Sequence, residues 1–79
     1  MTLDRLPLRR PATVNRLLGG APDWPRQLQD LGFVPGETVQ VLHQAWRGDP
    51  LVVQVGASRF ALRRAEAACV ELRCATDLR

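Results

Sequence analysis

Few side chains in this chain could take part in covalent or acid–base chemistry. It has one histidine, two cysteines, one serine, and no lysine or tyrosine. Nucleophilic catalysis needs a nucleophile beside a base, and the sequence offers no motif that pairs Ser58 or a cysteine with His43. Gly19-Gly20 alone is not a phosphate-binding loop. We therefore expect a protein that is not an enzyme.

His43 is the one side chain that suggests a metal ligand. It falls in phase with Val39 and Val41, near the end of a predicted strand. Histidine commonly binds transition metals, but iron needs several ligands, and the acids here lie at no recognisable ligand spacing. A structural or surface histidine is favoured, and a metal site would need other donors that only the fold could bring together.

The two cysteines give no sign of a disulfide or a zinc site. Cys69 and Cys74 are five positions apart in a segment that alternates like a strand, and this odd spacing would place them on opposite faces. No C-x2-C pair exists. We expect both cysteines to be reduced, in a reducing cytosol, and to serve as small apolar side chains.

Arginine supplies the whole positive charge, which totals 11 basic against 8 acidic residues. Trp46 and Arg47 fall on a predicted loop tip, and these two residue types are common in binding hot spots. The alternative is that Trp46 folds over an end of the domain. Arg59, Arg63 and Arg64 form the densest basic cluster.

A nucleic-acid surface is the other reading of this basic cluster. Against it, Glu66 follows closely and no aromatic side chains interleave on the exposed faces. The net charge of +3 is small for a nucleic-acid footprint. We expect these arginines to face solvent or a protein partner, and we expect no nucleic acid.

The elements that must position these residues are short. At 79 residues the chain makes one domain, here 1–79, with a proline-broken basic arm over 1–11 and a frayed tail over 76–79. Alternating apolar residues predict strands over 12–18, 37–43, 51–55, 59–62 and 70–74. Val14 and Leu18 are expected to point inward, and Leu42 outward.

Two helical segments are predicted among these strands. A helix of about two turns follows the first strand, with Asp23 as its N-cap and Gly32 at its C-terminal end. The segment from Gly19 to Pro22 interrupts regular structure before this helix, and Pro35-Gly36 makes a turn after it. A single helical turn over 63–68 precedes the last strand. Five short strands with tight connections predict a mostly β, partly open small barrel.

Three motifs in order resemble the FeoA family. The stretch from Leu28 to Val41 is similar to the family pattern L-x-x-L-G-hydrophobic-x-P-G-x-x-V-x-V. Gly48-Asp49-Pro50-Leu51 follows at the family's spacing, and Phe60 to Ala67 resembles hydrophobic-A-L-R-x-x-E-A. The resemblance implies an SH3-like barrel. The chain departs from the family in having Leu8-Arg9 in place of Pro-Gly before the first strand, and Ala45-Trp46-Arg47 in place of Ala-Pro-Leu.

The resemblance also implies a function. It indicates an accessory protein of bacterial ferrous iron uptake, cytoplasmic at the inner face of the membrane, which binds a membrane transporter through that transporter's cytosolic GTP-binding region. Metal binding is ascribed to the family, so Fe²⁺ or Zn²⁺ is the ion to consider. A homodimer through exposed strand edges is left open. The alternatives are an SH3-like module of metal-responsive regulation and an RNA- or ribosome-associated barrel.

Overall fold

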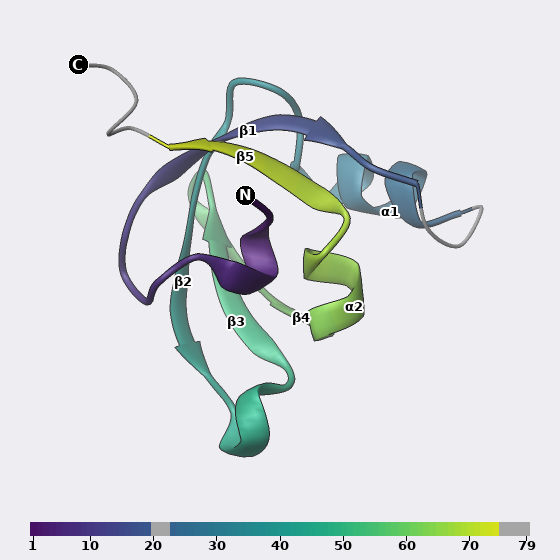
Figure 1. Cartoon of the computed structure of the whole chain (residues 1–79). Helices are drawn as coiled ribbons and strands as arrows, with labels where there is room; N and C mark the ends of the chain where they lie inside the picture. Colours follow the sequence, from purple (N-terminus) through teal and green to yellow (C-terminus); the bar gives the residue numbers. More distant parts are fainter. Residues whose placement is uncertain (20–22, 75–79) are drawn as a thin grey trace.

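The computed structural model describes residues 1–19 and 23–74, which form one curved antiparallel sheet with short helices (Figure 1). The five strands are β1 (Ala12–Leu17), β2 (Thr38–Gln44), β3 (Leu51–Val55), β4 (Ser58–Leu62) and β5 (Val70–Cys74). Their order in the sheet is β4-β3-β2-β1-β5. The sheet is not closed, because β4 and β5 are its two ends. This confirms the predicted mostly β, partly open architecture.

The strands from β1 to β4 pair antiparallel in the order in which they occur in the sequence. Gly36, with φ of 93°, follows Pro35 in the turn before β2, where the Glu37 amide donates to the Val34 carbonyl at 3.0 Å. Gly56, with φ of 59°, lies in the turn that joins β3 to β4, and Val55 pairs with Ser58 across it. The last strand, β5, returns to pair antiparallel with β1.

The helix α1 (Trp24–Leu31) lies between β1 and β2 and buries Leu28 against the sheet. Gly32 ends it in the left-handed conformation, with φ of 112°, as predicted. The Asp23 prediction is partly wrong. Asp23 occupies the N-cap position, but its backbone is itself helical and its carboxylate makes no capping bond. Capping by a side chain needs an extended backbone at that residue.

Two β-bulges change which side chains face the core. In β1 the register shifts between Val14 and Arg16, and Leu17, rather than the expected Leu18, packs against the core. In β2 the register shifts between Val41 and His43, so Leu42 is buried and His43 is exposed. The expectations for Leu18, Leu42 and the phase of His43 were therefore wrong, because an extra residue in a strand inverts the alternation beyond it.

The N-terminal arm, to which the sequence assigned no regular structure, is part of the fold. It contains the 3₁₀ turn η1 (Leu3–Arg5), whose Leu3 is completely buried. Thr2 forms a β-bridge with Glu71 of β5, and the Met1 carbonyl accepts a hydrogen bond of 2.8 Å from the Leu72 amide. The first and last described segments therefore lie side by side, as Figure 1 shows.

A single hydrophobic cluster joins all these elements. Its largest fully buried side chains come from η1, from α1 and the segment after it, and from β1, β2, β3 and β5; they are Phe33, Leu3, Leu28, Leu51, Val14, Val39, Val41, Val53 and Val70. The short helix α2 (Arg64–Ala67) lies just before β5, where a helical turn was predicted, and buries Ala67. The predicted turn residues Gly20 to Pro22 and the tail 76–79 lie outside the described residues.

Candidate partner-contact surface

The loop between β2 and β3 carries the most exposed aromatic side chain among the described residues. This loop contains the 3₁₀ turn η2 (Trp46–Gly48), and Trp46 is 84% exposed. The loop tip predicted for Trp46 is confirmed, and the alternative that it folds over the barrel is wrong. The Arg47 guanidinium carbon lies 5.8 Å from the centre of the Trp46 ring, within cation–π range.

Arg64 fastens the base of this loop, which the sequence did not indicate. Its guanidinium donates hydrogen bonds to the Gly48 carbonyl from Nε at 3.0 Å, and to Gln44 Oε1 at 3.0 Å. A third bond, 2.6 Å long, reaches the Asp4 carbonyl in η1. The Arg64 amide also donates to Asp49 Oδ1 at 2.9 Å. One residue of α2 therefore ties together the loop and the N-terminal arm.

The predicted basic cluster is divided by this arrangement. Arg64 is half-buried and its guanidinium is bonded within the chain, whereas Arg59 on β4 and Arg63 before α2 are exposed. The Arg63 amide donates a hydrogen bond of 2.9 Å to Glu66 Oε1. The structure gives Arg64 a structural role, and contact of Arg59, Arg63 and Arg64 with a partner stays a prediction.

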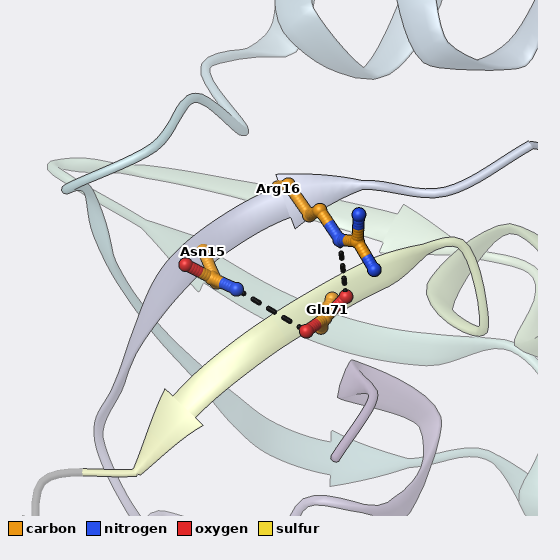
Figure 2. A network of polar contacts seen from close by, with 3 residues as sticks. All are labelled: Asn15, Arg16 and Glu71. Carbon is orange, nitrogen blue, oxygen red and sulfur yellow. Dashed lines mark hydrogen bonds and ion pairs between the residues drawn. The ribbon is translucent and has the colours of Figure 1, made fainter.

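A second polar contact joins β1 to β5 (Figure 2). Arg16 Nε lies 2.6 Å from Glu71 Oε1, and Asn15 Nδ2 donates to Glu71 Oε2 at 3.2 Å. The bond from Arg16, followed by that from Asn15, holds the pKa of Glu71 below its ordinary value. Sequence reasoning missed this contact because its members are far apart in the chain and meet only through the pairing of β1 with β5.

The candidate metal ligands do not come together. His43 is exposed near the end of β2, and the described residues contain no group of three His, Cys, Asp or Glu side chains able to hold an ion. Cys69 precedes β5 and is buried, and burial raises the pKa of its thiol. The side chain of Cys74 lies outside the described residues. These residues alone do not fit a metal centre.

The described part of the chain has no pocket, and none of its helices is long and apolar enough to cross a membrane. What it presents is a small curved sheet, capped by short helices, with an exposed Trp-Arg loop tip. Such a sheet places the protein among the SH3-like β domains. Within that class the assignment is specific: a model of the FeoA domain matches residues 1–74, and the chain belongs to the FeoA family, which is associated with ferrous iron transport.

Solved structures agree with this assignment. FeoA of Stenotrophomonas maltophilia, crystallised with zinc and described as an SH3 domain protein, is 45% identical, with a TM-score of 0.84 over 92% of this chain and 89% of that one. FeoA of Chlorobium tepidum is 32% identical, with a TM-score of 0.85 over 95% and 70% of the two chains. Iron(II) transport protein A of Clostridium thermocellum is 34% identical, with a TM-score of 0.86, and this chain spans 46% of its length.

A more distant likeness concerns the fold alone. The T. acidophilum protein IdeR shares 16% identity, with a TM-score of 0.77 over 94% of this chain and 33% of that one. No curated protein matches the sequence.

Proposed function

We propose that this protein is a non-enzymatic accessory of bacterial ferrous iron uptake. It acts in the cytoplasm at the inner face of the membrane, where it binds and modulates a ferrous iron transporter through the cytosolic GTP-binding domain of that transporter. Membership of the FeoA family supports the link to iron transport. The name of the Stenotrophomonas relative, which describes a possible activating factor of ferrous iron transport, is consistent with an accessory role.

The observation that carries the proposed binding is the exposure of Trp46. A tryptophan that is 84% exposed leaves a large apolar surface in water, and burying it in a partner would contribute on the order of 2 kcal/mol. Arg47 stacks on it, and exposed Arg59 and Arg63 add positive charge elsewhere on the surface. We propose that these residues meet the transporter.

The test is capture from detergent-solubilised membranes of the host at moderate salt. The tagged wild-type protein should retain a GTP-binding membrane transporter, and Trp46→Ala plus Arg47→Ala should lose it. Leu8→Ala plus Arg26→Ala is the matched control, since it removes an exposed apolar side chain and an exposed arginine elsewhere on the surface. Recovery of nucleic acid or ribosomal protein, without a transporter, would overturn the proposal.

We further propose that Fe²⁺ or Zn²⁺ binds only where a second molecule completes the site. His43 offers one exposed nitrogen, and one ligand does not hold such an ion. A Zn²⁺ titration followed by sedimentation velocity should show metal-dependent dimers that His43→Ala abolishes. Tight binding of Zn²⁺ to the monomer, unaffected by His43→Ala, would contradict this.

A further inference from the structure

At the tip of the β2–β3 loop, the exposed side chains of Trp46 and Arg47 lie on a backbone that is energetically unfavourable at Arg47. Arg47 has φ of 75° and ψ of 9°, in the left-handed region that residues with a Cβ rarely adopt. Its side chain is exposed, and its guanidinium lies over the ring of the exposed Trp46. Unfavourable conformations persist where surrounding bonds determine them.

Arg64 makes hydrogen bonds to the loop on both sides of Arg47. They reach the Gly48 carbonyl, directly after Arg47, and Gln44, two residues before Trp46. The loop closes on itself through the Gly48 amide, which donates to the Ala45 carbonyl at 2.7 Å. A Cβ added at Gly48 would lie 3.2 Å from a guanidinium nitrogen of Arg64, so the two segments are closely packed.

We infer that Arg64 is a positioning residue, which holds the Trp46–Arg47 pair as a preformed surface for a carboxylate-bearing segment of the protein partner. This inference rests on the proposed function and extends it by naming how the surface is built and which chemistry it recognises. Preformed surfaces bind more tightly because less conformational freedom is lost on association.

The carboxylate follows from how the loop uses its own charges. Asp49 is the acid of the loop, and its Oδ1 accepts the Arg64 amide. Among the described residues no carboxylate is paired with Arg47, whose guanidinium lies against the Trp46 ring. A guanidinium placed in this way can offer its N–H groups to a carboxylate in a planar, two-bond geometry that lysine cannot reproduce.

The third bond of Arg64 extends this support to the N-terminal arm. Because the guanidinium also donates to the Asp4 carbonyl, the loop is fixed against η1 and not only against its own hairpin. Arg64 is therefore expected to govern the mobility of the loop more than that of the sheet.

Amide hydrogen exchange tests the positioning role without any partner. Arg64→Met keeps the aliphatic stem and removes every guanidinium bond. It should speed exchange at the amides of Ala45 and Gly48 about tenfold, while the core amide of Val53 keeps its protection. Arg26→Met, an exposed arginine on α1, is the control that should change neither. Unchanged exchange at Ala45 and Gly48 in Arg64→Met would overturn the positioning role.

Capture of the detergent-solubilised transporter tests the surface. Arg64→Met and Arg47→Gln should each weaken capture of the transporter about tenfold. Arg47→Lys should capture more than Arg47→Gln but less than wild type, and Arg26→Met should capture as much as wild type. If Arg64→Met loosens the loop without weakening capture, the preformed surface is wrong. Full capture by Arg47→Lys or Arg47→Gln would overturn the paired-carboxylate geometry, as would Arg47-dependent retention of RNA.

Failure of the proposed function gives a different result. If wild-type protein with its ordered loop captures no transporter, the proposed function is wrong, and so is the transporter as the partner of this surface. Hydrogen exchange then still decides whether Arg64 positions the loop. If wild-type protein captures the transporter and all loop variants do so equally, the function stands and this inference fails.

Discussion

At Arg47 the backbone takes a left-handed conformation that glycine would adopt more readily, and the next residue, Gly48, also has a positive φ, of 78°. Three effects set the energetic cost of replacing Arg47 by glycine. Relief of the left-handed conformation favours glycine by about 1–2 kcal/mol. Greater freedom of the unfolded chain opposes it by about 0.4–1 kcal/mol, and loss of the cation–π contact by about 0.5 kcal/mol.

These terms nearly cancel, so Arg47→Gly should change the free energy of unfolding by no more than about 1 kcal/mol in either direction. The matched change Arg26→Gly falls inside α1, where glycine should cost about 1 kcal/mol. Urea denaturation of the two variants checks this. A loss in Arg47→Gly larger than that in Arg26→Gly would show that Arg47 contributes to folding through contacts beyond those described.

Glu71 gives the protein a predictable response to acid. Its folded pKa lies below the ordinary value of 4.5 because of the bonds from Arg16 and Asn15. It therefore stabilises the fold above the unfolded pKa, and this contribution is lost as pH falls through the lower, folded pKa. Glu71→Gln should lower the melting temperature at neutral pH, and this deficit should shrink as the pH falls below 4.5. A deficit that stays the same as the pH falls would show that packing, rather than charge, explains the effect.

The sequence was least able to predict the environments of individual side chains. Arg63 and Arg64 are neighbours with the same side chain, and nothing in their order distinguishes the exposed one from the one bonded to the loop. The difference depends on which way α2 turns its first residue, toward Gly48 and Asp4. Exposure of Trp46, by contrast, follows from its place in a turn between two strands.

Among the elements, the N-terminal arm is the one whose structure the sequence indicated least. Its prolines interrupt any regular pattern, so no regular structure could be assigned to it, yet Leu3 is completely buried and Leu6 nearly so. Leu3→Ala should cost about 2–4 kcal/mol, because the cavity cannot collapse in so small a core. Leu8→Ala, at a leucine that is 49% exposed, should cost less than about 0.5 kcal/mol. Thermal denaturation of both variants measures the difference, and equal losses would place Leu3 outside the core.

Most element positions follow from local patterns, whereas the two bulges do not. Alternation located β2 and β3, and Gly32 marked the C-terminal end of α1. A bulge needs no special residue, so Asn15 and Leu42 carry no local sign of one. The register is set by partner strands, and Leu42 and His43 exchange their expected environments for this reason.

The whole molecule rests on one hydrophobic cluster, to which the arm, the sheet and both α-helices contribute. We therefore propose that it unfolds as a single cooperative unit, in keeping with the one domain expected from its length. Far-ultraviolet circular dichroism and the fluorescence of Trp24, measured in Trp46→Phe, should give coincident transitions in urea. Separate transitions would indicate that the arm or α1 melts independently.

The position of β5 has a consequence for biosynthesis. This strand pairs with β1, and its Leu72 amide donates to the Met1 carbonyl, so two segments far apart in the sequence complete one another. While the ribosome is still making residues 70–74, the outer edge of β1 has no partner strand and Val14 lacks part of its cover. Contacts so distant along the chain form slowly, and an unpaired edge favours association with other chains. The core therefore cannot close until residues 70–74 have been synthesised and can pair with β1.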